Sequence, residues 1–291
     1  MRLASYEHRG QLLVGAVVGE RIADLSPVVL GLGQDAISRD SMLSLLAGGD
    51  AAIEAARKHS AQASRQAIPL KDVHLLAPIP RPGKIVAIGR NYADHAAETG
   101  VAPFEIPRVI AKLPSCVVGP GSVVRRPTGV TKLDYEVELG VVIGRRAKLV
   151  SRASALEYIA GYTILDDVSA REFQFDVSPA QTTFAKSMDD FCPLGPWIVT
   201  RDEIPDPQSL ALKLWVNGEL LQDGNTHDMI FGVGQLIEYI SRYMTLEPGD
   251  VIATGTPAGV GAFRKPPRWL QPGDKVELEI SGIGRLLHWI G

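Results

Sequence analysis

The sequence is poor in cysteine, in aromatic residues and in long apolar runs, and these shortages exclude several classes of protein. Two cysteines in 291 residues, Cys116 and Cys192, are too few for a disulfide framework or a cysteine-rich zinc site. No apolar run approaches the roughly 20 residues that a membrane-spanning helix needs. The first ten residues also lack the apolar core of a secretory signal, so we expect a cytoplasmic protein with reduced thiols.

The charge is nearly balanced, with 30 basic and 33 acidic residues and a net charge of −3. No basic stripe indicates a nucleic-acid or membrane partner. Glycine (29) and proline (20) are frequent while aromatic residues make up only 6%, which favours many short strands joined by turns. The sequence therefore predicts a mixed α+β fold that is mainly β.

A proline-rich stretch divides the chain into two unequal parts. Residues 77–84, APIPRPGK, carry three prolines, which remove hydrogen-bond donors and stiffen the chain. We expect a small N-terminal α/β domain over residues 1–76, a linker over 77–84 and a larger C-terminal domain over 85–291.

Hydrophobic periodicity and turn residues predict the elements within each part. Before the linker we expect strands over 11–20 and 21–26, a turn near Gly19 and Glu20, and a helix over 41–59. After it we expect two helices, over 151–161 with Gly161 as its stop and over 231–244. The residues VNGE, 216–219, predict a tight hairpin turn. The predicted strands of this part span 84–89, 135–144, 161–168, 196–200, 212–222, 250–256 and 275–280.

Two glycine-rich segments have features of ligand-binding loops. GLGQDA, residues 31–36, has the spacing G-x-G-x-x-A, but no βαβ unit surrounds it, so we predict a turn and not a dinucleotide site. TGTPAGVG, residues 254–261, follows a predicted strand. It is either a plain turn or a backbone that a ligand approaches closely.

Acidic residues gather at the ends of two predicted strands. In LDYEVELGVVIG, alternation places Glu136 and Glu138 on the same face. In GYTILDDVSARE, the neighbours Asp166 and Asp167 point to opposite faces, so one can point inward while the other is solvated. The two glutamates either belong to a solvated face or hold a cation. Carboxylates without a His or Cys cluster suit Mg²⁺ or Mn²⁺ better than Zn²⁺.

A histidine and a glutamate form a second candidate group in AIGRNYADHAAETG. A strand ends at Gly89, and Asn91 is expected to cap a short helix that ends before Gly100. His95 and Glu98 stand at i and i+3 and share a face of that helix. The pair is either a solvated surface pair or a general base whose imidazole the carboxylate orients, on a helix that serves as a lid.

Two lysines lie in apolar surroundings and complete the set. Lys112, in AKLPS, and Lys186, in TTFAKSMDDF, either neutralise an anionic substrate or are ordinary surface lysines.

Taken together and in order, six segments resemble the fumarylacetoacetate hydrolase family over about residues 80–290. They are IGRNYADHAAETG, DYEVELGVVIG, GYTILDDVSARE, FAKSMDDFCPLGPWIVT, LWVNGELLQDGNTHDMIF and TLEPGDVIATGTPAGVG. The resemblance implies a β-sandwich-like roll in the catalytic domain and a small, variable N-terminal domain. It also implies a homodimer.

The resemblance also assigns roles to residues. It implies that Glu136, Glu138 and Asp167 hold a divalent cation, Mg²⁺ or Mn²⁺. It places His95 and Glu98 in a lid dyad that activates water, and it gives Lys186 the task of stabilising negative charge. The positions that match the substrate site of relatives are Arg90, Lys112, Gln174, Lys186 and Thr256. One departure is Asp166, where many relatives have asparagine.

The implied reaction is the metal-dependent hydrolysis of a C–C bond in an acylpyruvate or related β-diketo acid, through an enolate. Two alternatives stay open. Decarboxylation of oxaloacetate, or isomerisation of an unsaturated 2-oxo dioic acid, would use the same enolate without attack by water. A catalytically idle binding protein would keep the fold alone.

Overall fold

The computed structural model describes residues 1–33, 36–38, 40–100 and 102–291. Gln34 and Asp35, in the middle of the turn predicted for residues 31–36, lie outside the described residues.

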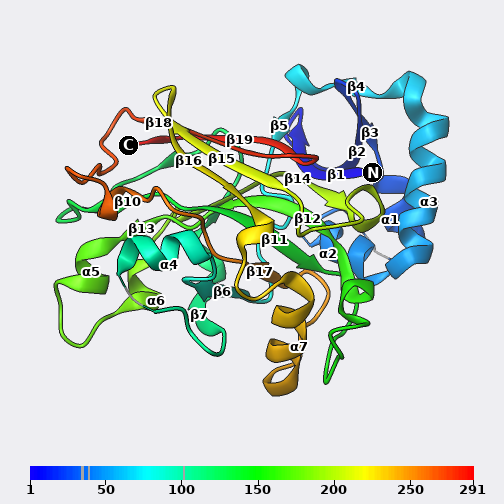
Figure 1. Ribbon diagram of the computed structural model, residues 1–291. Coiled ribbons are helices and arrows are strands. Elements are labelled where there is room, and N and C mark those ends of the chain that lie inside the picture. Colours follow the sequence, from blue (N-terminus) through cyan, green and yellow to red (C-terminus); the bar gives the residue numbers. More distant parts are fainter. Residues whose placement is uncertain (34–35, 39, 101) are drawn as a thin grey trace.

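A large mixed sheet runs through the whole molecule (Figure 1). Its strands follow the order β4-β3-β2-β1-β14-β12-β11-β17-β6-β7, with β5 beside β1 and β8 beside β14. The bounds are β1 (Arg2–His8), β2 (Gln11–Val18), β3 (Arg21–Asp24), β4 (Ile68–Pro69), β5 (His74–Leu75), β6 (Ile85–Gly89), β7 (Arg108–Lys112), β8 (Val117–Val118), β11 (Val137–Ile143), β12 (Ile159–Asp166), β14 (Cys192–Thr200) and β17 (Val251–Ala253).

A second sheet packs face to face on the centre of the first. Its order is β16 (Glu219–Asn225), β15 (Ala211–Val216), β18 (Lys275–Ile280), β19 (Gly284–Ile290) and β9 (Val123–Val124). β15 and β18 bury every second side chain. One face of β15 packs on β11 and one face of β18 packs on β12, while the other face of each strand is partly exposed to solvent. A small ladder joins β10 (Leu133–Asp134) to β13 (Ser169–Ala170). The two packed sheets confirm the predicted sandwich.

Helices lie at the edges of this core. Figure 1 shows α3 along the right-hand side, α7 at the bottom, and α4, α5 and α6 together at the lower left. Their bounds are α1 (Ser26–Gly31), α2 (Ser41–Ala47), α3 (Gly49–Gln62), α4 (Ala93–Thr99), α5 (Arg171–Phe175), α6 (Thr182–Ala185) and α7 (Val233–Tyr243). Single 3₁₀ turns are η1 (Ala63–Gln66), η2 (Leu70–Asp72), η3 (Pro114–Cys116), η4 (Ala155–Tyr158), η5 (Arg201–Glu203), η6 (Thr226–Asp228) and η7 (Gly261–Phe263). No described helix is both long and apolar enough to cross a bilayer.

Most predicted elements are confirmed. The predicted helix over 41–59 forms as two helices, because the chain turns at Gly49, whose φ of 61° is in the left-handed region. The hairpin over 216–219 forms with Asn217 and Gly218 at φ of 53° and 84°, as a tight primed turn requires.

The prediction of a helix over 151–161 is wrong. Only the 3₁₀ turn η4 forms there, and Gly161 lies inside β12 instead of ending a helix. A side chain at Gly161 would overlap the carbonyl oxygen of Val199 on the neighbouring strand β14. The glycine therefore permits a close approach of two backbones, which sequence periodicity does not reveal.

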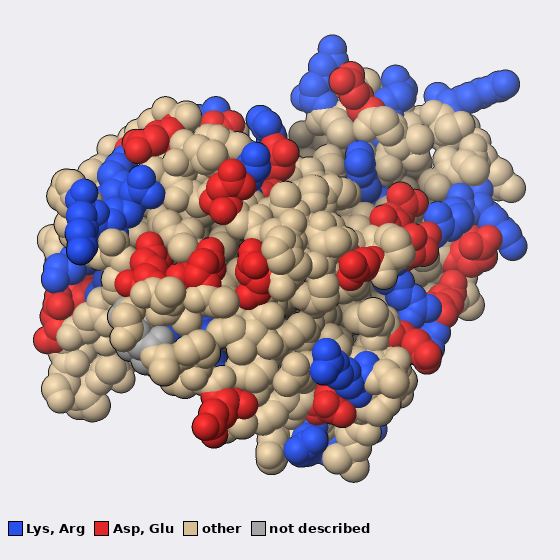
Figure 2. Space-filling model, in the orientation of Figure 1, with Lys and Arg blue, Asp and Glu red and all other residues tan. Residues whose placement is uncertain are grey.

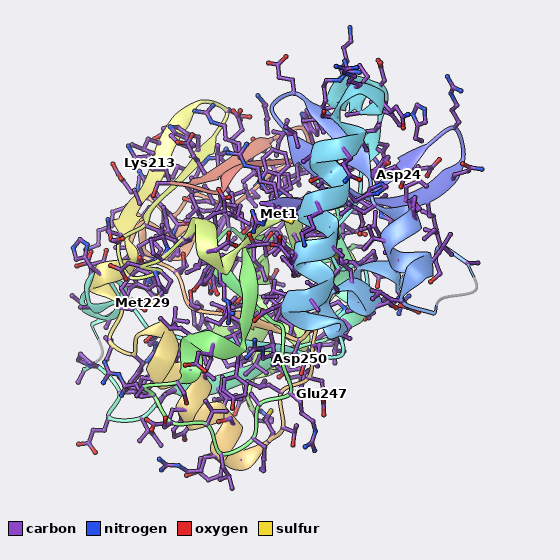
Figure 3. All side chains as sticks on the ribbon, turned by 90° about the vertical axis from the view of Figure 1, so that its right-hand side faces the viewer. Met1, Asp24, Lys213, Met229, Glu247 and Asp250 are labelled. Carbon is purple, nitrogen blue, oxygen red and sulfur yellow. The ribbon has the colours of Figure 1, made fainter. Side chains whose placement is uncertain are left out.

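The N-terminal strands β1 to β4 belong to the same sheet as the strands after residue 84. β1 pairs with β14, where Leu3 lies opposite Ile198. Figure 3 looks onto α3 and shows Met1 beside this helix. Residues 77–84 are irregular, and Ala77 and Ile79 within them are buried. The division into domains at this segment stays a prediction. Basic and acidic side chains are interspersed over the face in Figure 2, in keeping with the balanced charge.

Substitution of Gly161 by alanine is expected to destabilise the protein, because the new methyl group has no room beside β14. The expected loss is about 1–3 kcal/mol in the free energy of unfolding, the range of overpacked cores. Urea unfolding followed by circular dichroism measures it. Gly31→Ala is the matched control, since nothing lies within 4 Å of its added methyl group. Equal stability of the two variants would contradict the packing argument.

Candidate active site

The predicted acidic residues meet where two central strands end. β11 and β12 pair antiparallel, with Val137 opposite Asp166. Glu136 therefore lies just before β11 begins, and Asp167 lies just after β12 ends. The Asp167 N–H donates to the Glu136 carbonyl oxygen at 3.0 Å, which fixes the two backbones at this end. Strand pairing thus brings together Glu136 and Asp167, which are 31 positions apart in the sequence.

Glu136, Glu138 and Asp167 form one compact group. Each offers a carboxylate oxygen, and these three oxygens lie within 4.8 Å of one another. The three residues are 5%, 2% and 1% exposed. The alternative of a solvated face is therefore wrong, because the face that carries the two glutamates is buried.

Two buried lysines lie against this triad. The Lys186 ammonium donates to Glu136 at 2.9 Å, to Asp167 at 2.6 Å and to the Ser169 hydroxyl at 2.9 Å. The Lys112 ammonium lies 2.7 Å from the other Asp167 oxygen. Neither is a surface lysine, since Lys186 is 5% exposed and Lys112 1%.

Arg171 is a buried member of the site that the sequence reading did not single out. Its guanidinium donates to Glu136 at 2.5 Å, to Asp134 at 2.8 Å and to the side-chain oxygen of Gln174 at 2.8 Å. Its position four residues after Asp167, in the segment DVSAR, was the available signal. Arg171 therefore links a candidate metal ligand to a candidate substrate contact.

The surroundings shift the pKa values of the two glutamates in opposite directions. Burial acts to raise the pKa of Glu136, but ion pairs with Lys186 and Arg171 outweigh it and lower this pKa to about 2. Burial raises the pKa of Glu138 well above its usual value, and repulsion from Asp167 and Glu136 adds to the effect. Glu136 is thus neutralised by fixed cations, whereas no described lysine or arginine forms an ion pair with Glu138.

The composition of this cluster fits a hard divalent cation. The donors are carboxylate oxygens without histidine or cysteine, as Mg²⁺ and Mn²⁺ prefer. Among the described residues, the cluster holds one more carboxylate than cations: Asp134, Glu136, Glu138 and Asp167 against Lys112, Lys186 and Arg171. A cation beside Glu138 would offset this surplus negative charge.

The His95–Glu98 dyad is assembled on α4. Nδ1 of His95 lies 3.0 Å from a Glu98 oxygen, and His95 is 6% exposed, so the pair is not a solvated surface pair. The helix is docked on the glycine-rich loop: Gly259 N–H donates to Glu98 at 3.1 Å and Ala258 N–H donates to Asp94 at 3.2 Å. In this structure α4 therefore lies closed against the loop.

The predicted cap of α4 is wrong. Tyr92, not Asn91, stands at the N-cap, although Gly100 ends the helix with a left-handed φ of 69° as expected. The Asn91 side chain instead donates to the carbonyl oxygens of Phe231 and Thr254 at 3.0 and 2.8 Å. A buried asparagine amide satisfies distant backbone groups here, so it is not available to the helix.

The glycine-rich loop approaches the triad with its backbone. Gly255, at a φ of 96°, donates its N–H to Glu138 at 2.8 Å. The hydroxyl of Thr256 accepts a hydrogen bond from the Gln222 side chain at 2.8 Å, which orients it. The loop is thus more than a plain turn, because it contacts a candidate metal ligand directly.

One pocket of about 160 Å³ opens onto these groups. Its polar lining comes from Arg90, His95, Arg108, Glu136, Glu138, Asp167, Arg171, Gln174, Thr182, Lys186 and Thr256. Phe175 and Phe263 supply an apolar side, and the ring centroids of Phe263 and His95 are 6.0 Å apart. The triad and the dyad therefore face the same space.

The structure brings together all but one of the predicted substrate contacts. Arg90, Gln174 and Thr256 line the pocket. Lys112 is not among its lining residues. It lies behind Asp167, and burial alone would lower its pKa, but the Asp167 carboxylate outweighs burial and raises it. Arg108 lines the pocket and was missed, although alternation along β7 puts it on the same face as Lys112.

Asp166 is not solvated, contrary to one part of the sequence prediction. It is fully buried and lies 2.7 Å from Nε2 of His288, a residue of β19 that is also fully buried. Its other oxygen accepts a hydrogen bond from the Glu136 N–H at 2.9 Å. The Asp166–His288 pair therefore holds the backbone of a candidate metal ligand from the opposite side of β12.

Residues 84–290 match the family described as fumarylacetoacetate (FAA) hydrolase C-terminal. The chain belongs to the fumarylacetoacetate hydrolase family.

Individual members of the family match nearly the whole chain. Human mitochondrial oxaloacetate tautomerase FAHD2A is 40% identical over 99% of this chain and 91% of its own length. Fumarylacetoacetate hydrolase from psychrophilic Exiguobacterium antarcticum superposes with a TM-score of 0.84 at 37% identity, over 100% and 99% of the two chains. Maleylpyruvate hydrolase from Sphingobium sp. SYK-6, solved with manganese(II) and pyruvate, superposes with a TM-score of 0.81 at 32% identity. The match covers 100% of this chain and 98% of that one. These relatives are enzymes with different reactions, so the family alone does not choose one.

Replacing Asp166 is expected to weaken cation binding, because its carboxylate positions the Glu136 backbone. Loss of such an outer partner typically costs 10- to 100-fold in metal affinity. Titration of Mn²⁺ by calorimetry should show this loss for Asp166→Leu. A smaller loss is expected for Asp166→Asn, which keeps an acceptor for the Glu136 N–H.

Asp223→Asn, on the exposed edge strand β16, is the control for a lost surface charge. Circular dichroism checks that each variant is folded. Wild-type Mn²⁺ affinity in a folded Asp166→Leu protein would show that Asp166 does not position the ligand.

Proposed function

We propose that the protein is a divalent-metal-dependent enzyme that hydrolyses a C–C bond in a β-diketo acid of the acylpyruvate or fumarylacetoacetate type. The observation that carries the proposal is that an acidic triad and a histidine–glutamate dyad face one small pocket. The relative from Sphingobium, solved with manganese(II) and pyruvate, supports both the cation and the class of product.

The residues that would hold the cation, Mg²⁺ or Mn²⁺, are Glu136, Glu138 and Asp167. When bound, it would supply positive charge that binds a 2-oxo acid and stabilises the negative charge of an enolate. The Lys186 ammonium, 2.6 Å from Asp167, adds a second positive charge at the same end of the pocket. Stabilisation of this kind is worth about 3–4 kcal/mol where it has been measured for single donors.

His95 is positioned to activate water. An ionised Glu98 only accepts hydrogen bonds, so Nδ1 of His95 carries the proton and Nε2 is left to take one. His95 would remove a proton from water, and the oxygen would attack the carbonyl carbon distal to the 2-oxo acid. The C–C bond then breaks, its electron pair forms the enolate of the 2-oxo acid, and His95 returns the proton to that carbon.

Other residues would bind and orient the substrate. Gln174, held by Arg171, and Thr256, held by Gln222, present fixed polar groups to the pocket. The closed helix α4 limits the entry of bulk water, which strengthens these contacts. Lys112 would act on the substrate through Asp167, because its ammonium lies behind the triad.

A second candidate function uses the enolate without attack by water. The human relative is named an oxaloacetate tautomerase, and it aligns over 99% of this chain. Tautomerisation or decarboxylation of oxaloacetate, or isomerisation of an unsaturated 2-oxo dioic acid, would need the same triad. In these reactions His95 would move a proton on carbon or take no part.

Two finer expectations are also proposals. A homodimer is expected from the family resemblance, and the free edge of the large sheet at β7, where Val109 is 40% exposed and Leu113 50%, supports it. A cytoplasmic location is expected from the sequence, whereas the human relative is named as mitochondrial.

His95→Ala is expected to lower hydrolysis of acylpyruvates by about 10²- to 10⁴-fold, the usual contribution of a general base. Turnover of acylpyruvates and of oxaloacetate, with products identified by mass, measures the effect in the presence of Mg²⁺ and of Mn²⁺. His227→Ala is the control, because the His227 side chain is 64% exposed. If the protein only tautomerises or decarboxylates oxaloacetate, and His95→Ala keeps that activity, the hydrolase proposal is wrong.

Addition of Mn²⁺ or Mg²⁺ after treatment with a chelator is expected to raise the melting temperature. A cation at 100 times its Kd stabilises the folded state by about 2.7 kcal/mol. Glu138→Gln should lose most of this stabilisation, because it removes the charge that fixed cations do not offset. The exposed Glu157→Gln is the control. The same cation-induced shift in wild type and Glu138→Gln would place the cation elsewhere.

A further inference from the structure

Two arginines line the pocket together, from neighbouring strands. Arg90 is half-buried and Arg108 is exposed at the rim. Their guanidinium carbons lie 5.6 and 6.0 Å from the centroid of the same ring, that of Phe104. The ring of Phe104 thus contacts both cationic groups.

The fold fixes the positions of both arginines. Arg90 directly follows β6, and Arg108 begins β7, where it pairs with Gly89. Arg90 has a φ of 56°, a left-handed conformation that is unfavourable for a non-glycine residue. Strain of this kind persists where the surroundings hold it and gathers at binding sites. Ile110, two residues after Arg108 on the same strand face, also lines the pocket.

The two arginines have no ion-paired carboxylate in the part of the chain that the structure describes. Within residues 1–33, 36–38, 40–100 and 102–291, no carboxylate forms an ion pair with Arg90 or Arg108, whereas Arg171 and Lys186 are both paired with acids. Burial lowers the pKa of Arg90, and repulsion from Arg108 lowers it further. An anion between these guanidiniums would relieve that repulsion.

We infer that Arg90 and Arg108 form a subsite for a second carboxylate, so that the substrate is a dicarboxylic 2-oxo acid. The inference rests on the proposed function, in which the 2-oxo acid group binds at the triad. Guanidinium groups recognise carboxylates through paired, charge-assisted hydrogen bonds, which explains why arginine and not lysine stands at both positions. An acylpyruvate with an apolar tail would leave both cations without a partner.

A matched pair of substrates tests the subsite. Fumarylpyruvate and crotonylpyruvate differ only at the distal end, where a carboxylate in the first replaces a methyl group in the second. Wild type with Mn²⁺ should prefer fumarylpyruvate in kcat/KM by about 10- to 100-fold, the value of hydrogen bonds between charged groups. In Arg90→Gln and Arg108→Gln the preference should collapse, mainly through a higher KM for the dicarboxylate.

Controls separate charge from general damage. Arg108→Lys should restore part of the preference, because it returns the positive charge without the planar fork. Arg65→Gln, an exposed arginine in η1, should leave the preference of wild type unchanged. If wild type cleaves both substrates equally and Arg108→Gln changes neither, the subsite is refuted while the proposed hydrolysis stands.

Binding measurements decide the case in which neither substrate is cleaved. That result would reject the hydrolase proposal. Calorimetry with oxaloacetate and with pyruvate, in the Mn²⁺-loaded protein, then tests the subsite alone. Tighter binding of oxaloacetate that disappears in Arg108→Gln would support the subsite, and an unchanged oxaloacetate affinity would overturn it.

Discussion

The site depends on the burial of more negative than positive charge at the shared end of β11 and β12. A backbone hydrogen bond from Asp167 to Glu136 places the carboxylates beside each other. Carboxylates this close repel one another, and burial makes the repulsion stronger. The fold offsets most of it with Lys186, Lys112 and Arg171, and a divalent cation would offset the rest. This electrostatic balance connects the stability of the core with its chemistry.

Much of the surrounding structure serves to hold that arrangement. Asp166 and His288 fix the backbone of Glu136 from the second sheet, and the glycine-rich loop binds Glu138. The same loop accepts contacts from α4, so the dyad on α4 and the candidate metal ligands share one support. The arginine pair lies at the rim of the same pocket.

The sequence predicted the parts of the site that strict alternation controls. Period-two spacing put Glu136 and Glu138 on one face, and helical spacing paired His95 with Glu98, as the structure has them. It did not decide whether those faces are buried, because burial depends on which sheet packs above them. The order of motifs along the chain supplied that information through the family resemblance.

Long-range contacts explain what the sequence did not predict. Asn91 bonds to Phe231, 140 residues away, and therefore does not cap α4. Asp166 forms a hydrogen bond with His288, which lies on the other sheet and 122 residues away in the sequence. The place of Arg108 in the site depends on the pairing of β7 with β6, and the need for glycine at position 161 depends on the close approach of β14.

A crystal structure of the protein soaked in Mn²⁺, with anomalous scattering, tests the central account most directly. We expect one anomalous peak about 2.0–2.2 Å from a carboxylate oxygen of each triad residue. A triad without a peak, with Mn²⁺ bound elsewhere, would contradict it.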